Sequence, residues 1–222
     1  MSEQQSNSSD RSGRSPYRRQ KSYDSGSYQN MAFHPQNVIL FLVLIGITAL
    51  FLSLSAAFVY TRVQSNLPPL KLPPLFLLNT VILLGSSATM VWAKRMYLAD
   101  QTEKYQQALV ATMLLSVLFM IAQIFAWRSL FQQDILINSD NSASYLYVIS
   151  GLHFAHVIAG LPFLGAFLWK ARKQMKEPVS VLVYFSDPEK RLKLRLLTIY
   201  WHFLDALWIY LVLFFYINYW LR

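Results

Sequence analysis

Four side chains in the C-terminal half could do chemistry inside an otherwise apolar environment. His202 and Asp205 are the only residues of the stretch 196–220 that readily carry a charge at neutral pH, and His153 and His156 lie in a second apolar stretch upstream. Imidazole nitrogens and a carboxylate can bind a metal, relay protons or hold helices together by hydrogen bonds. Their spacing and the elements around them decide between these chemistries.

His202 and Asp205 are three residues apart, which places them on one face of a helix together with Trp201 and Trp208. A polar stripe in a membrane-spanning helix must point at protein, because hydrocarbon offers ionisable groups no partner. We therefore expect this face to lie against another helix.

The expected partner is the segment 151–160, in which His153 and His156 repeat the spacing of three. Gly151 and Gly160 flank these histidines, and small residues let membrane helices approach closely. The sequence thus predicts that His153, His156, His202 and Asp205 form one network between two helices.

Haem or metal ligation by these residues is an alternative. A bis-histidine haem needs two histidines that face each other across the porphyrin, whereas histidines three apart project from adjacent turns of one helix. A di-iron carboxylate site needs several acidic residues within the bundle, and Asp205 is the only one. We therefore predict no catalytic, cofactor or metal residue, and favour a structural network or lipid contact that also includes the amide of Gln123. A proton relay is a further alternative.

The composition is that of a membrane protein. Hydrophobic residues make up 55% of the 222 and charged residues 14%, with a mean hydropathy of +0.31. The net charge of +9 does not predict nucleic-acid binding, because the basic residues flank apolar stretches. The absence of cysteine excludes disulfides and thiolate sites, and the first thirty residues lack the apolar segment of a signal peptide.

The chain is predicted to be an all-α membrane protein with a bundle of five spans. Apolar stretches long enough to cross a bilayer lie at residues 38–60, 75–93, 105–127, 145–169 and 196–220. Residues 1–32 read as a disordered basic tail, residues 33–222 as the transmembrane domain, and residues 170–195 as a long basic loop. Alternate sides hold 16 and 4 Lys and Arg residues, which predicts a cytoplasmic N-terminus and an external C-terminus.

Two segments give the chain a family resemblance. Tyr-Trp-His-Phe-Leu-Asp-Ala-Leu-Trp at 200–208 and Gly-Leu-His-Phe-Ala-His-Val-Ile-Ala-Gly at 151–160 resemble signature helices of subunit III of haem-copper terminal oxidases. The segment 79–93, with its Asn-Thr start and Ser/Thr-rich centre, looks like another helix of that family. Five spans resemble the short bacterial form of the subunit.

The resemblance implies a subunit of the bacterial inner membrane that has no redox centre. Such a subunit packs on catalytic subunit I, with subunit II and small subunits nearby, and haem and copper are expected in those partners. It binds phospholipid and supports proton uptake and durability during oxygen reduction. An accessory protein of nitric oxide reductase with the same fold and an independent b-type cytochrome stay as alternatives.

Two positions depart from the family pattern. Family members commonly have an acidic residue in the first of these helices, where this chain has Ile47 or Thr48. The family often has Gln followed three residues later by Glu, and here Gln123 is followed by Ala126. Any role of these two carboxylates in oxygen access or proton supply is therefore in doubt for this chain.

Overall fold

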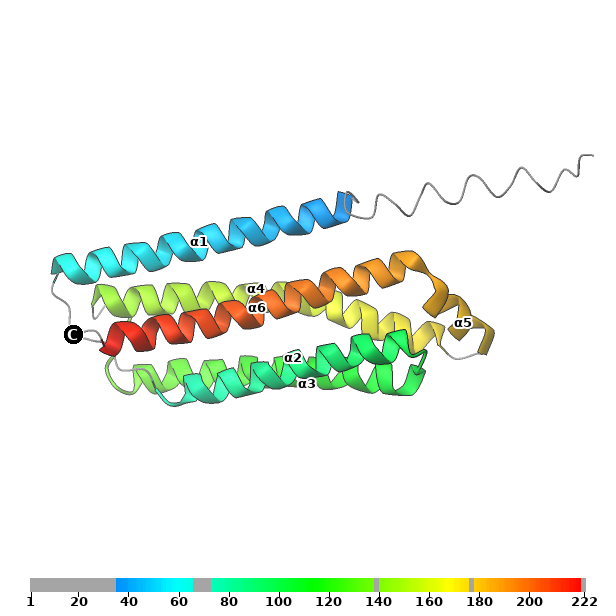
Figure 1. Cartoon of the computed structure of the whole chain (residues 1–222). Coiled ribbons are helices and arrows are strands. Elements are labelled where there is room, and N and C mark those ends of the chain that lie inside the picture. The colour runs from blue at the N-terminus through cyan, green and yellow to red at the C-terminus, as the bar shows by residue number, and fades with distance from the viewer. Residues whose placement is uncertain (1–34, 66–72, 138–139, 176–177, 221–222) are drawn as a thin grey trace, which may run out of the picture. The chain divides into compact units, whose positions relative to one another are not determined.

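A computed structural model describes residues 35–65, 73–137, 140–175 and 178–220. Within these ranges the chain forms helices and turns, with no strand. The helices are α1 (Pro35–Ser65), α2 (Leu75–Leu98), α3 (Thr102–Phe131), α4 (Asn141–Gln174), α5 (Pro178–Ser186) and α6 (Pro188–Trp220) (Figure 1). By length and composition α1, α2, α3, α4 and α6 can cross a membrane, which confirms the five predicted spans.

Two units follow from the contacts within the chain, residues 1–39 and residues 40–222. The described part of the first is the start of α1, where Pro35 occupies a first turn that needs no backbone N–H from it. The predicted disordered tail at 1–32 lies outside the described residues. Everything below concerns the second unit.

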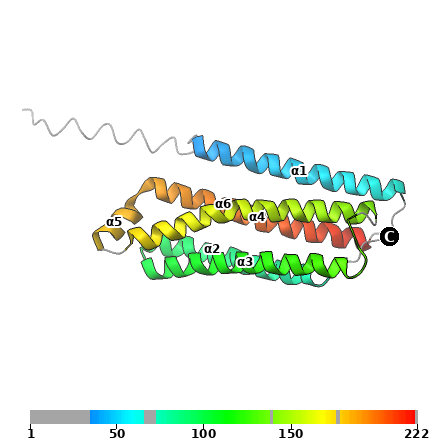
Figure 2. The ribbon, with the colours of Figure 1, turned by 180° about the vertical axis from the view of Figure 1, so that it is seen from behind.

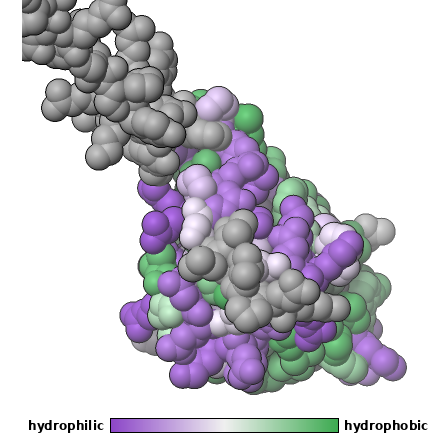
Figure 3. All heavy atoms as spheres, turned by 90° about the vertical axis from the view of Figure 1, so that its right-hand side faces the viewer, coloured by the Kyte–Doolittle hydropathy of each residue, from purple (hydrophilic) through white to green (hydrophobic). Residues whose placement is uncertain are grey.

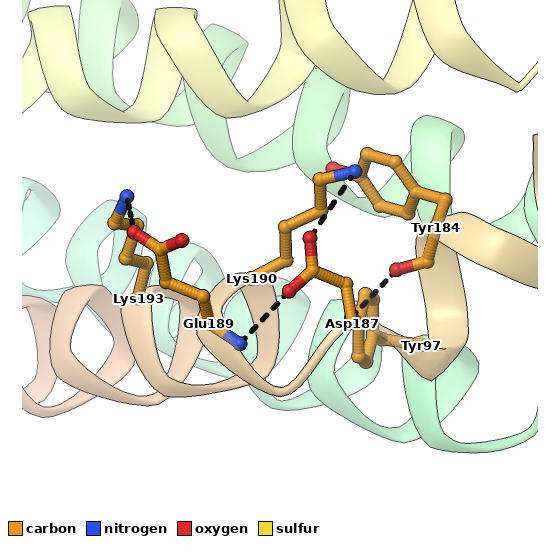
Figure 4. A network of polar contacts seen from close by, with 6 residues as sticks. All are labelled: Tyr97, Tyr184, Asp187, Glu189, Lys190 and Lys193. Atoms are coloured by element: carbon orange, nitrogen blue, oxygen red, sulfur yellow. Dashed lines mark hydrogen bonds and ion pairs between the residues drawn. The ribbon is translucent and has the colours of Figure 1, made fainter.

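The prediction of a long loop at 170–195 is wrong. α4 continues to Gln174, α5 is a separate short helix, and α6 begins at Pro188, two turns before the predicted span. The Asp187 carboxylate caps α6 by accepting a hydrogen bond of 2.9 Å from the Glu189 backbone N–H, next to a proline at the first helical position. Glu189 and Lys193 then pair at 2.5 Å along the first turn (Figure 4).

α5 is tied to α2 and α6 by polar and aromatic contacts. The Tyr97 hydroxyl of α2 donates to the Tyr184 carbonyl at 3.3 Å, and Lys190 Nζ lies 4.3 Å from the centre of the Tyr184 ring (Figure 4). Lys190 also pairs with Asp187 at 3.6 Å. Burial raises the pKa of Tyr184, and the Asp187 charge adds to the rise. These contacts hold a helix too short to cross a membrane against the end of the bundle.

α2, α3, α4 and α6 form a ring of neighbours in which each helix packs against the next. α2 and α6 lie on the side that is nearer the viewer in Figure 1. α3 and α4 lie on the opposite side, which Figure 2 shows. α1 packs on this ring through large aromatic side chains: Phe58 contacts the Tyr145 ring of α4 at 6.0 Å and the Phe214 ring of α6 at 5.5 Å. The core of the ring is rich in fully buried aromatic and aliphatic residues such as Phe119 and Trp208.

The basic segments around residues 94–104 and 170–195 gather at one end of the ring (Figure 1). The end of α2, the start of α3, the end of α4, α5 and the start of α6 all lie there (Figure 1). Viewed from this end, hydrophilic side chains cover much of the bundle while hydrophobic ones lie along its flank (Figure 3). This clustering fits the charge asymmetry found in the sequence, whereas the orientation in the membrane stays a prediction.

Candidate functional site: the polar face of helix α2

The small polar residues of α2 receive the two indole N–H groups of α6. Trp201 donates to the Ser86 hydroxyl at 3.0 Å, and Trp208 donates to the Thr80 hydroxyl at 3.2 Å. The two helices run in opposite directions (Figure 1). The step of six residues from Ser86 back to Thr80 on α2 therefore lies beside the step of seven residues from Trp201 to Trp208 on α6. Each indole N–H is buried in an apolar setting, and the α2 hydroxyls supply the acceptors that it needs.

α2 bonds to α3 in the same manner. The Asn79 amide donates to the Gln123 carbonyl oxygen at 2.6 Å, and the hydroxyls of Thr89 and Thr112 lie 2.9 Å apart. Asn79, Gln123 and Thr112 are fully buried. Gln123, which the sequence predicts to be part of a structural network or lipid contact, bonds to Asn79, and α2 is the helix that joins α3 to α6.

His202 and Asp205 meet at a single hydroxyl of α2. His202 Nδ1 lies 2.7 Å from Ser87 Oγ, and the Asp205 carboxyl group lies close enough to the Ser87 side chain to interact with it. Asp205 is buried, and its Oδ2 atom has no hydrogen-bond partner among the described residues. His202 is half-buried, so the cluster extends from the core to the outer side of the α2–α6 interface.

His153 occupies a different place, in the aromatic core between three helices. Its ring centre lies 5.0 Å from that of Trp208 and 5.9 Å from that of Phe119. The side chain is fully buried, and neither ring nitrogen has a hydrogen-bond partner within the described residues. In this environment the imidazole serves as an aromatic packing group.

His156 lies on the side of α4 that faces α1. Its Nδ1 atom lies 2.7 Å from the Leu152 carbonyl of its own helix, and its ring centre lies 5.9 Å from that of Phe51. The Tyr200 hydroxyl of α6 donates to the backbone carbonyl of His156 at 2.9 Å. The contact between α6 and His156 therefore uses the backbone and not the imidazole.

The two glycines of this segment differ. A Cβ atom built on Gly160 would lie 3.0 Å from the Trp201 ring and 3.1 Å from the Tyr200 ring, so its lack of a side chain does permit close approach of α4 and α6. The same construction at Gly151 meets nothing within 4 Å. The prediction of close approach holds for Gly160 and is wrong for Gly151.

The hydrogen bonds of the four ionisable residues therefore do not join them into one network. His202 and Asp205 share Ser87, while His153 and His156 have separate surroundings. The face of α6 does point at protein, as predicted, but its polar groups bond to α2. Among the described residues, no group of three or more His, Cys, Asp and Glu side chains is placed to hold a metal ion.

The sequence contains a signal for this pairing. Hydroxyl and amide side chains recur along α2 at Asn79, Thr80, Ser86, Ser87 and Thr89, and such groups hydrogen-bond between membrane helices. Thr80 and Ser86 are six residues apart, close to the seven that separate the two α6 tryptophans, so their spacing fits a pairing of these two helices.

The positions that depart from the family pattern are apolar or satisfied within their own helix. Ile47 is buried in the core, and the Thr48 hydroxyl donates to the Leu44 carbonyl at 2.8 Å. Ala126 is fully buried. Ile47 and Ala126 thus belong to the packed core, whereas Thr48 is exposed.

Comparisons with known proteins agree on one family. The sequence model of the family described as Cytochrome c oxidase subunit III matches residues 36–221. Cytochrome c oxidase subunit 3 of Synechocystis sp. is 28% identical over 204 residues, which cover 88% of this chain and 82% of the relative. The protein of the same name from Papio hamadryas is 32% identical over 145 residues, or 65% of this chain and 49% of the relative.

A third relative, Cytochrome c oxidase subunit 3 of Loxodonta africana, is 32% identical over 147 residues, covering 66% of this chain and 50% of the relative. The chain thus spans about half the length of the two mammalian relatives and most of the length of the Synechocystis one.

Proposed function

This chain belongs to the cytochrome c oxidase subunit III family, and from that premise we propose that it is a non-catalytic subunit of a bacterial aerobic respiratory haem-copper oxidase. It is a multi-pass membrane protein, and we place it in the bacterial inner membrane. It covers one flank of the catalytic subunit, which holds haem and copper. Subunit II and small subunits complete the complex.

The observation that supports this proposal best is the family match, which extends over all five membrane helices. The geometry agrees with a scaffold role. The polar groups of α2, α3 and α6 are largely used to bond these helices to one another, so they form a rigid block instead of an open reaction centre. This block can stabilise a neighbouring subunit during turnover and support proton uptake on the basic side.

Phospholipid binding is part of the proposal, and a groove along α3 supports it. The groove has a volume of about 440 Å³ and lies at the basic end of α3 and α4. Arg172 of α4 lines its polar end together with Glu103 and Gln107 of α3, and Val110 and Leu114 line its apolar floor. A phosphate could bind the guanidinium while an acyl chain lies along α3.

The experiment that tests the function is purification of this chain from its native membrane in a mild detergent. Co-purifying proteins are identified by mass spectrometry, phospholipid is measured in the same sample, and optical spectra are taken before and after the subunits are separated. We expect a haem-copper catalytic subunit to co-purify, and the haem absorbance to leave with it.

Three other outcomes would overturn the proposal. A nitric oxide reductase as the partner would assign the chain to that complex. A haem band that stays with the isolated chain would make it a b-type cytochrome, with His153, His156 and His202 as ligand candidates. Purification of the chain without any haem-copper partner would remove the basis for a subunit role.

A further inference from the structure

We propose that the outer side of the α2–α6 interface, centred on Ser87 and His202, is the surface that docks a membrane-spanning helix of the catalytic subunit. This inference rests on the proposed function, because it requires that the chain is part of an oxidase complex.

One ring nitrogen of His202 has no hydrogen-bond partner among the described residues, and it marks this surface. His202 Nδ1 lies 2.7 Å from Ser87 Oγ, so the contact of His202 with α2 uses one ring nitrogen only. The ring is half-buried, and no hydrogen bond to Nε2 occurs within the described residues. In a neutral imidazole one nitrogen is a hydrogen-bond donor and the other is an acceptor. Nε2 is therefore either a donor or an acceptor without a partner, depending on the tautomer.

The depth of the cluster excludes water and lipid headgroups as ready partners. Ser87 lies seven residues before Lys94, and His202 lies seven residues after Arg195. At a rise of 1.5 Å per residue, both are about 10 Å inside the charged end of their helices. A polar atom left without a partner in hydrocarbon is strongly unfavourable, which favours a protein group against this surface.

Small residues beside His202 make room for a neighbouring helix. Ala88 follows Ser87 on α2, Ala206 follows His202 by one turn on α6, and both are exposed. Close approach of helix backbones is a main source of attraction between membrane helices. Ile199 and Leu213, which are 39% and 55% exposed, continue the same face of α6 on either side.

The partner should present a hydroxyl or carboxamide side chain opposite His202, because these groups can donate or accept as Nε2 requires. The competing face on α1 lacks this feature. Its exposed Thr48 and Ser53 hydroxyls donate to the Leu44 and Ala49 carbonyls of the same helix, both at 2.8 Å. The exposed hydroxyls of α1 are therefore already hydrogen-bonded, whereas Nε2 of His202 on the α2–α6 face is not.

Site-specific photocrosslinking in the assembled complex tests the inference. Benzoylphenylalanine is incorporated singly at Ile199 and Leu213 on the proposed surface. The control positions are Leu52 on α1 and Phe163 on α4, which are 52% and 65% exposed. After illumination of native membranes, the crosslinked species are purified through this chain and identified by mass spectrometry. We expect adducts with the catalytic subunit at Ile199 and Leu213, and at least ten times less at the two controls.

A second readout uses His202→Phe, with His156→Phe as the matched control. Loss of Nε2 should lower the amount of catalytic subunit retained at raised detergent concentration several-fold, and the control should leave retention unchanged. Adducts at Leu52 or Phe163 in place of Ile199 and Leu213 would overturn the docking surface while leaving the function intact. So would adducts at Ile199 and Leu213 that contain only lipid or a second copy of this chain. If no oxidase subunit co-purifies with the unmodified chain, the proposed function itself fails.

Discussion

The Ser87 hydroxyl stands between an imidazole and a carboxyl group, and such an arrangement couples their energies. His202 Nδ1 lies 2.7 Å from this hydroxyl, and the buried Asp205 carboxyl group interacts with the same side chain. When either partner is removed, the bond that remains changes its geometry and its proton arrangement. Groups within one hydrogen-bond network commonly show interaction energies of 0.5–3 kcal/mol, roughly, in double-mutant cycles.

We therefore expect His202→Ala and Asp205→Asn to be non-additive. The free energy of unfolding of the detergent-solubilised protein should show a coupling of at least about 0.5 kcal/mol between the two changes. The control cycle pairs His156→Ala with Asp205→Asn, since His156 bonds to its own helix, and it should add to within about 0.5 kcal/mol. Additivity in the first cycle would show that Ser87 does not link the two side chains.

For single residues, the sequence predicts the helix face on which a side chain lies better than the helix that it contacts. Helical spacing correctly placed His202, Asp205 and the tryptophans on one face that meets protein. It could not say which helix lies opposite, because spacing describes rotation about one helix axis and contains no information on neighbours. His153 shows the same limit, since its sequence context matched that of His156 and only the fold separates their environments.

Among the helices, the long apolar ones were predictable and α5 was not. Hydropathy identifies a span because twenty or so apolar residues have few other stable locations. α5 has nine residues, too few to cross a membrane, and its position depends on contacts with Tyr97 and Lys190. A short helix of this kind is fixed by tertiary contacts, which outweigh local preference.

The contact between α4 and α6 provides a test at the level of the helix pair. Gly160→Ala should destabilise the bundle by about 1–3 kcal/mol, because the new methyl group would lie 3.0 Å from the Trp201 ring and 3.1 Å from the Tyr200 ring, and these packed rings would have to shift. Gly151→Ala is the matched control on the same helix. It meets no atom within 4 Å and should be neutral or raise stability by up to about 1 kcal/mol through helix propensity.

The comparison is made by thermal unfolding of both variants in the same detergent. Equal melting temperatures for Gly160→Ala and the unmodified protein would mean that the α4–α6 distance is larger than the structure gives. A loss of stability in Gly151→Ala would show that a neighbour covers this part of α4.

For the molecule as a whole, the arrangement of charge is the property that sets its orientation. The described basic residues of four helix ends lie at one end of the bundle, next to α5 (Figure 1). The opposite end has few cations, among them Arg62, which donates to Asn218 and joins α1 to α6. Because the cytoplasmic side of membrane proteins is enriched in Lys and Arg, the end that holds α5 should face the cytoplasm.

The absence of native cysteine makes this orientation directly measurable. Two exposed glutamines lie in the turns at opposite ends of the bundle, Gln101 between α2 and α3 and Gln132 after α3. In intact spheroplasts, a membrane-impermeant maleimide should label Gln132→Cys at once. It should label Gln101→Cys only after the membrane is permeabilised. The reverse pattern would place the basic end outside, and the positive charges would then need another explanation, such as binding to an anionic partner on that side.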